Sequence, residues 1–103
     1  MTTREIVTGR VASVEKAKSV RSGIEYVKYR LDLEDSPRRV YYAHVTDENW
    51  SDTGRALARH YAEKFNLAEK EKDFPSQIGR RFRLELRNND QRPGLSVRLL
   101  EAL

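Results

Sequence analysis

Cysteine is absent from the 103-residue sequence. Disulfide bonds, thiol catalysis and zinc sites built on thiolates are therefore excluded. Histidine is nearly absent, since only His44 and His60 occur, and neither has carboxylates beside it at the spacing of a metal site. A glycine-rich phosphate loop is missing too, and no nucleophile has an evident base. We therefore predict a protein without catalytic residues, metal or cofactor, and not an enzyme.

Long hydrophobic runs are also missing. The residues that follow Met1 are polar or charged and lack the apolar segment of a signal peptide. No later run approaches the length that spans a membrane. We therefore expect a soluble, cytoplasmic protein that has no membrane partner.

The composition is that of one folded, basic domain. Hydrophobic residues make up 38% and charged residues 35% of the sequence, and its length suits a single core, so we expect one domain over 1–103. The formal net charge is +4 and the calculated pI is about 9.6. Residues 78–98 hold six arginines against two acidic residues, so this segment alone carries the charge of the whole chain. A local arginine excess favours an anionic partner.

Residues 26–45 have the pattern of a β-hairpin. Apolar and polar residues alternate along 26–34, residues 35–38 contain Pro37 and suit a turn, and 39–45 alternate again. The predicted inward residues are Val27, Tyr29, Leu31 and Leu33 on the first strand and Tyr41, Ala43 and Val45 on the second. The predicted outward face combines rings with cations: Tyr26, Lys28, Arg30, Tyr42 and His44. A solvated face needs charges but not rings, so we interpret this face as a binding platform.

The segment before the hairpin reads as a strand and a basic loop. The strand is predicted over 5–15, and Gly9 followed by a change of parity at Val14 predicts a bulge or bend within it. Such a bend lets one strand serve two packed parts of a small barrel. Residues 16–23 form the loop, which ends at Gly23.

One α-helix is predicted after the hairpin. Apolar residues at helical spacing place it over 54–66, and residues 67–73 extend it by a turn that Phe74-Pro75 ends. The candidates for its N-cap are Ser51, Asp52 and Thr53. Trp50, in the connection before the helix, is interpreted as a lid over one end of a barrel rather than as a base-stacking residue.

Two strands complete the chain. The fourth opens at Ile78-Gly79 and the fifth runs over 95–102, with a turn over 88–94 between them. The fourth strand is predicted to place Phe82, Leu84 and Leu86 inward and Arg81, Arg83, Glu85 and Arg87 outward.

The predicted order is therefore strand, strand, strand, helix, strand, strand. With the Val-Thr-Gly-Arg-Val run at 7–11 and Ile-Gly-Arg-Arg-Phe-Arg-Leu at 78–84, nearly the whole chain resembles the OB fold, the small barrel of many oligonucleotide-binding proteins. The resemblance implies an all-β fold with one helix, a five-stranded Greek-key barrel.

The resemblance also implies where a ligand lies. In OB folds it crosses strands two and three, flanked by the loops that follow strands one and four. The residues that this places at a nucleic-acid-binding site are Tyr26, Lys28, Arg30, Tyr42 and His44 on the hairpin, Lys16, Lys18 and Arg21 in the first loop, and Arg87 and Arg92 with the amides Asn88, Asn89 and Gln91 around the second. Cations neutralise phosphates, and rings stack on unpaired bases at roughly 1–3 kcal/mol each. Single-stranded DNA or RNA therefore suits this face better than a duplex.

The hairpin has an alternative register, shifted by one residue. In that register Tyr26 and Tyr42 become core residues, and Tyr29 and Tyr41 face outward. The leucines of residues 26–34 favour the first register.

Two functions are consistent with these patterns. The first is single-strand nucleic-acid binding by stacking and phosphate neutralisation. The second is an OB-type protein-interaction subunit of a larger complex, such as a DNA-processing one, with protein partners or a second copy of the chain. Its motivation is a set of exposed hydrophobic candidates (Val20, Val40, Trp50 and Leu100) and the acidic residues Asp32, Glu34 and Asp35.

Overall fold

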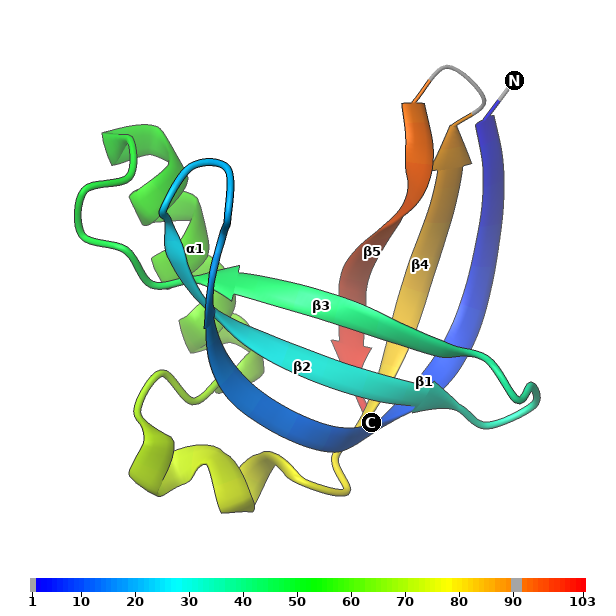
Figure 1. Cartoon of the computed structure of the whole chain (residues 1–103). Helices are drawn as coiled ribbons and strands as arrows, with labels where there is room; N and C mark the ends of the chain where they lie inside the picture. The colour runs from blue at the N-terminus through cyan, green and yellow to red at the C-terminus, as the bar shows by residue number, and fades with distance from the viewer. Residues whose placement is uncertain (1, 90–91) are drawn as a thin grey trace.

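The chain forms a strongly curled sheet of five antiparallel strands with one α-helix at its side (Figure 1). This computed structural model describes residues 2–89 and 92–103. The order of the strands in the sheet is β3-β2-β1-β4-β5, so β3 and β5 are its edges. In chain order the elements are β1 (Thr2–Lys18), β2 (Glu25–Leu33), β3 (Arg39–Val45), α1 (Asp52–Phe65), the 3₁₀ helix η1 (Glu71–Gln77), β4 (Arg81–Asn89) and β5 (Arg92–Ala102).

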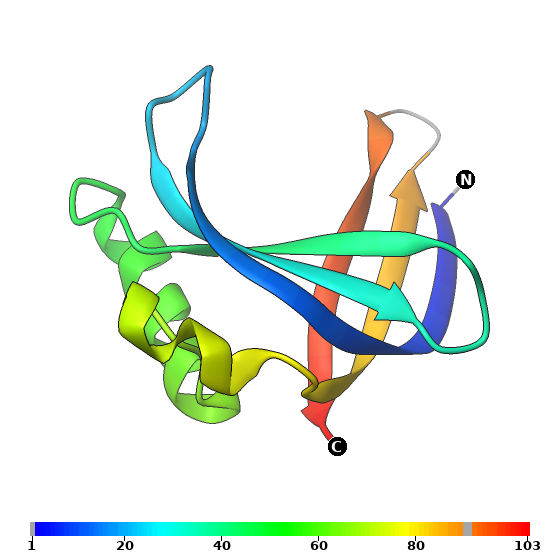
Figure 2. The ribbon, with the colours of Figure 1, turned by 60° about the horizontal axis from the view of Figure 1, so that its bottom comes forward.

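Strand β1 belongs to both halves of the sheet because it bends in the middle (Figure 2). Residues 2–10 pair with β4, and residues 9–18 pair with β2. The pairing with β2 shifts register between Val11 and Ser13, which confirms the predicted bulge or bend. The bend curls the sheet into a half-barrel and brings Cα atoms of the edge strands β3 and β5 within 8 Å of one another.

The bend is held by close packing and by two backbone hydrogen bonds. A Cβ atom at Gly9 would lie 2.9 Å from Leu84 Cδ1 and 3.3 Å from Leu31 Cβ, so only glycine leaves room for the core there. Val11 N donates to the carbonyl of Arg80, and Gly79 N donates to the carbonyl of Val11, both at 2.8 Å. The segment before β4 is thereby fixed to the inside of the bend.

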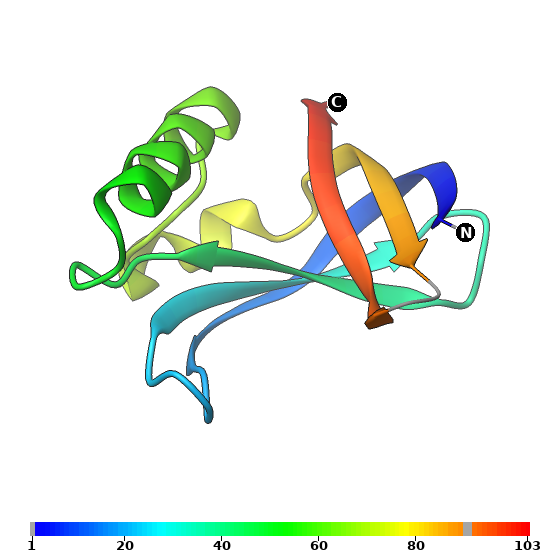
Figure 3. The same cartoon turned by 90° about the horizontal axis from the view of Figure 1, so that it is seen from above.

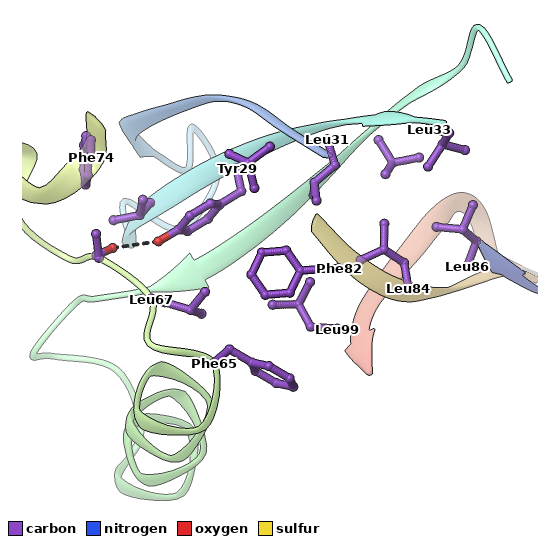
Figure 4. Packing of buried hydrophobic residues seen from close by; sticks show 14 residues of the cluster. Tyr29, Leu31, Leu33, Phe65, Leu67, Phe74, Phe82, Leu84, Leu86 and Leu99 are labelled. Carbon is purple, nitrogen blue, oxygen red and sulfur yellow. Dashed lines mark hydrogen bonds between the residues drawn. The ribbon is translucent and has the colours of Figure 1, made fainter. Parts of the chain in front are cut away.

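The hydrophobic core lies inside the curl (Figure 4). Every residue predicted inward on the first strand of the hairpin and on the fourth strand is buried, which confirms the inward half of the predicted alternation. Glu85, predicted outward on the fourth strand, is buried as well, at 2% exposed. Residues after the helix close one end of the core. The buried hydrophobic residues are Val11, Val27, Tyr29, Leu31, Leu33, Val40, Phe65, Leu67, Ala68, Phe74, Phe82, Leu84, Leu86 and Leu99.

Tyr29 is the one core residue that carries a hydroxyl. Its ring is 2% exposed, and its hydroxyl donates to the carbonyl of Ala68 at 2.9 Å, the bond drawn in Figure 4. This bond fastens the segment after α1 to the middle of β2. Burial raises the pKa of Tyr29 to about 12, since a buried phenolate would lose its hydration.

Helix α1 stands beside the sheet rather than across it (Figure 3). Ser51 Oγ accepts from Gly54 N at 3.1 Å and caps its start, as one of the three predicted caps. Of its apolar stripe only Phe65 is fully buried, and Leu57, predicted to face the core, is 51% exposed. The ring of Trp50, predicted as a lid over a barrel end, lies against Gly54 in the first turn of the helix.

Arg80 connects the end of α1 to the sheet. Its guanidinium donates to the carbonyls of Phe65 at 2.6 Å and Asn66 at 2.9 Å, and to Gln77 Oε1 at 2.7 Å. It also lies over the ring of Phe82, with Cζ 4.7 Å from the ring centroid. A cation at this place donates hydrogen bonds to the last carbonyls of the helix, which have no partner within it. Its positive charge also interacts favourably with the negative end of the helix dipole.

Several boundaries differ from the prediction. Phe74-Pro75 does not end a helical turn but lies inside η1, where the fixed φ of proline suits a short 3₁₀ helix. The fourth strand begins at Arg81 rather than at Ile78, because Gly79 turns the chain with a φ of +90°. The predicted turn over 88–94 is shorter, since β4 reaches Asn89 and β5 starts at Arg92.

Within residues 2–89 and 92–103, no helix is both long enough and apolar enough to cross a bilayer.

Gly9→Ala should lower the free energy of unfolding by about 1–3 kcal/mol, because the new methyl group overlaps Leu84 and Leu31. In a strand with open space the same change would stabilise the protein by about 0.4–1 kcal/mol through the unfolded chain. The sign of the change, measured by urea unfolding, therefore tests the close approach at the bend. A stability equal to or above the wild type would contradict it.

Tyr29→Phe should reduce the loss of folding stability that the protein shows as the pH becomes alkaline. The pKa of Tyr29 is about 12 in the folded chain against 10.0 for the free side chain. Its contribution is complete below pH 10.0 and is lost as the pH rises to about 12, because the unfolded state ionises first. Urea unfolding across this window should give a shallower decline for Tyr29→Phe, which at neutral pH loses about 1 kcal/mol with the hydrogen bond. If the stabilities of the wild type and of Tyr29→Phe fell equally over this pH window, the raised pKa of Tyr29 would be contradicted.

Candidate nucleic-acid interface

The outward side of β2 agrees with the prediction. Tyr26, Lys28 and Arg30 alternate with the buried residues of this strand and are half-buried. They point away from the core because successive side chains of a strand lie on opposite faces. Three of the predicted site residues therefore share one outer face.

The predicted register of β3 is wrong. Leu31 pairs with Val40, Tyr29 with Tyr42 and Val27 with His44. Directly opposed residues share a face of the sheet, so the buried residues of β2 place these partners on the inner face. Val40 is 3% and His44 2% exposed, and Tyr42 is half-buried. Tyr42 and His44 are therefore not part of an outward platform.

The buried residues of β3 have structural contacts instead. The ring of Tyr42 lies 6.4 Å from that of Tyr29, and burial raises the pKa of Tyr42. His44 Nε2 lies 3.1 Å from Glu69 Oε1, a contact that joins β3 to the segment after α1.

Tyr41 takes the place that the sequence assigned to Tyr42. It pairs with Arg30 on the outer face and is 49% exposed. We call the surface formed by Tyr26, Lys28, Arg30 and Tyr41 the outer hairpin face. The two tyrosines lie on neighbouring strands, and Tyr26 is four residues from the partner of Tyr41, about 13 Å along the sheet. The two rings therefore form separate contact surfaces on this face.

The cations of the outer hairpin face are held beside the rings. Lys28 Nζ lies 5.3 Å from the ring centroid of Tyr41 and 2.9 Å from Glu15 Oε1. The hydrogen bond and charge of Glu15 raise the pKa of Lys28, so its charge persists at any neutral pH. The second cation of this face is Arg30. Its Nε is buried and has no hydrogen-bond partner among the described residues, and Asp32 Oδ1 lies 3.6 Å away.

Lys16 and Lys18, predicted to lie in the first loop, belong instead to β1, and they lie on the opposite face of the hairpin from Tyr26. Lys16 pairs with Val27 and Lys18 with Glu25, so both belong to the other face. They line a hollow of about 790 Å³ between the hairpin, residues 46–49 and residues 69–70, which Tyr26 also borders. Its charged lining residues are Lys16, Lys18, Lys70, Glu25, Asp47, Glu48 and Glu69.

The hollow has no excess of positive charge. The carboxylate of Asp47 accepts from the backbone N of Glu25 at 3.0 Å and of Asn49 at 2.8 Å, and these bonds lower its pKa. Asp47 therefore stays ionised beside the lysines. Arg21 is exposed in the tip of the loop, next to Val20. The first loop thus meets the outer hairpin face only at Tyr26.

The remaining predicted residues lie elsewhere. Arg87 is on the outer face of β4, with its Nε 2.7 Å from Glu85 Oε1, and is not near the hairpin in the sheet order. Arg92 begins β5, but its side chain and that of Asn89 are outside the description, and so is all of Gln91. The structure thus brings together Tyr26, Lys28 and Arg30, adds Tyr41, and separates Arg87 from them.

A scan of models of known protein families finds no match to this chain, and a search of curated proteins finds no relative.

The register can be tested by truncating neighbouring tyrosines of β3. Tyr42→Ala should lower the free energy of unfolding by about 3 kcal/mol, because it removes a half-buried ring that packs on Tyr29. Tyr41→Ala should change it by less than about 1 kcal/mol, since an exposed ring contributes little to the core. Urea unfolding of the matched pair decides between the registers. A larger loss for Tyr41→Ala would reverse the assignment.

Proposed function

We propose that this chain binds single-stranded DNA or RNA through the outer hairpin face, and that its curled sheet is a Greek-key barrel of the OB type. The observation that carries the proposal is the pair of tyrosines, Tyr26 and Tyr41, standing beside Lys28 and Arg30 on a face that the core does not use. Rings stack on unpaired bases of any sequence, and adjacent cations neutralise the phosphates between them.

The arrangement of the strands supports the OB assignment. Strand β1 pairs with both β2 and β4, and the edge strands β3 and β5 approach one another. In Figures 1 and 2 the β1–β2 loop and the neighbouring ends of β4 and β5 project on the same side of the sheet. Loops in these positions flank the ligand in OB folds.

The charges of the outer hairpin face suit a ligand that is bound mainly by stacking of its bases, with a smaller contribution from attraction of its phosphates. Lys28 is shared between the carboxylate of Glu15 and the ring of Tyr41, and Arg30 lies near the carboxylate of Asp32. A face of this kind holds bases by their rings and contacts few phosphates. It therefore favours an unpaired strand over a duplex, whose bases are already stacked.

Tyr26→Ala and Tyr41→Ala should each weaken binding of a single-stranded oligonucleotide by about 1–3 kcal/mol, because each removes one stacking surface. Fluorescence anisotropy at one fixed salt concentration, with single-stranded DNA, single-stranded RNA and duplex DNA as ligands, gives the measurement.

The matched controls are Tyr26→Phe and Tyr41→Phe, which keep the rings and should bind nearly as the wild type does. Melting temperatures of all four variants should stay close to the wild type, so that a loss of binding is not a loss of fold. Equal affinity of the wild type and both alanine variants would remove nucleic-acid binding from this face.

A second candidate function, an OB-type protein-interaction subunit, has its own observation. Val20 is fully exposed at the tip of the β1–β2 loop, and Leu57 is 51% exposed on α1. Val20→Ser and Leu57→Ser together should leave oligonucleotide affinity unchanged if these residues serve a protein partner.

A further inference from the structure

A second charged surface covers the other half of the sheet. Because β1 pairs with β4 and β4 with β5, outward residues of these three strands lie side by side. We call this surface the arginine face: Arg4 and Arg10 on β1, Arg81, Arg83 and Arg87 on β4, and Arg98 on β5. Every cation on it is an arginine, and none is a lysine.

The register places like charges directly opposite one another. Arg4 pairs with Arg87, and Arg10 pairs with Arg81. Directly opposed like charges destabilise a sheet. Each pair must therefore be compensated, and each has one carboxylate that both of its guanidinium groups approach.

Glu85 compensates the first pair. Its Oε2 accepts from Arg4 Nη2 at 2.9 Å, and Arg87 Nε lies 2.7 Å from its Oε1. Burial alone would raise the pKa of Glu85, but the hydrogen bond from Arg4 and the charges of Arg4 and Arg87 outweigh it, and the pKa lies below its usual value. The carboxylate therefore remains ionised beneath them.

Glu34 compensates the second pair from the turn after β2. Arg81 donates to both of its oxygens, at 2.5 Å and 3.0 Å, and Arg10 Nη2 lies 3.8 Å from Oε1. The Arg81 hydrogen bonds lower the pKa of Glu34. In both pairs one negative charge serves two positive charges, so each pair keeps a net charge of +1.

The negative charge of Glu85 lies deeper than the positive charges of Arg4 and Arg87. The side chain of Glu85 is 2% exposed, whereas those of Arg4 and Arg87 are 62% and 53% exposed. Solvent therefore meets guanidinium groups and not the carboxylate. A guanidinium has five N–H donors, and these contacts use one or two of them. The others remain free to approach an anion.

We propose that the arginine face binds the phosphodiester backbone of a nucleic acid, as a second surface distinct from the outer hairpin face. This proposal rests on the proposed function for the kind of ligand, a nucleic acid, whereas the arginine face itself is defined independently of it. The planar fork of arginine matches phosphate geometry with two parallel hydrogen bonds. A protein partner would require an apolar centre, and the exposed large hydrophobic residue among these outward positions is Ile6 alone within the described residues.

Arg83 and Arg98 are the residues to test. Neither contacts Glu85 or Glu34 in the ion pairs of the described residues, so their replacement leaves both compensated pairs intact. Arg83 Nη1 instead donates to Oε2 of the exposed Glu101 at 2.8 Å, on the same face. The test variant is Arg83→Gln with Arg98→Gln. The matched control, Arg55→Gln with Arg59→Gln, removes the same charge from exposed positions of α1.

The probe is an abasic phosphodiester oligomer, which has phosphates but no bases to stack on tyrosine. The wild type should bind it, and the Arg83/Arg98 variant should bind more weakly, with a salt slope shallower by about 1.4 for two lost contacts. The Arg55/Arg59 control and the Tyr26→Ala, Tyr41→Ala double variant should keep the wild-type affinity for this probe.

Each result has a distinct meaning. Loss of binding to the base-containing oligonucleotide in the tyrosine variants alone reports on the outer hairpin face, whereas the abasic probe reports on the arginine face. If the Arg83/Arg98 variant and the helix control bind the abasic probe equally, or the wild type does not bind it, the inference is wrong. Equal binding of poly-glutamate of matched charge, with the same loss in the variant, would also overturn it in favour of an acidic protein.

Arg83→Lys with Arg98→Lys separates charge from geometry and protects the test against a folding defect. It should keep the salt slope of the wild type but lose affinity, because lysine keeps the charge and lacks the fork. Unchanged affinity in this variant, alongside an unchanged slope in the glutamine variant, would remove the arginine fork as the binding element.

Discussion

The bend in β1 is the constraint on which the rest of the structure depends. A single strand pairs with β4 through its first half and with β2 through its second half, so both halves of the sheet are fixed to one backbone. Gly9 lets Leu84 and Leu31 meet across the strand at the bend. The bulge between Val11 and Ser13 then changes which residues face inward. Bulges and glycines at close approaches are features that bend a strand, and here they lie where the two halves of the sheet meet.

The helix is a secondary addition to this arrangement. Phe65 enters the core, and Arg80 holds the carbonyls at the end of α1 while lying over Phe82. The Tyr29 hydroxyl fastens the following segment to β2. These contacts all lie at the C-terminal end of α1. Its first turns, with exposed Leu57, are therefore attached chiefly through the chain itself, and the sheet carries the candidate surfaces without them.

The sequence predicts the inward face of β2 because Val27, Leu31 and Leu33 alternate with charges, and no other register buries them. It does not predict β3 in the same way. Both parities of this strand contain rings and small apolar residues, so only the pairing of Tyr29 with Tyr42 decides which side is inner. The burial of Glu85 could not be predicted from the sequence either. Arg4 lies over it, and Arg4 is distant in the sequence and comes close only through the β1–β4 register.

The two outer surfaces differ in how their acidic residues are placed, and this difference suits two parts of one ligand. On the outer hairpin face Glu15 lies beside Lys28 and competes with any phosphate, while the rings of Tyr26 and Tyr41 remain accessible. On the arginine face Glu85 lies beneath Arg4 and Arg87 without covering them, while the exposed Glu101 pairs with Arg83 alone among the ion pairs of the described residues. Under the proposed function, the first surface therefore selects unpaired bases and the second contributes the salt-dependent attraction. Because β1 pairs with β2 on one side and with β4 on the other, the same bend that closes the core also sets the angle between them.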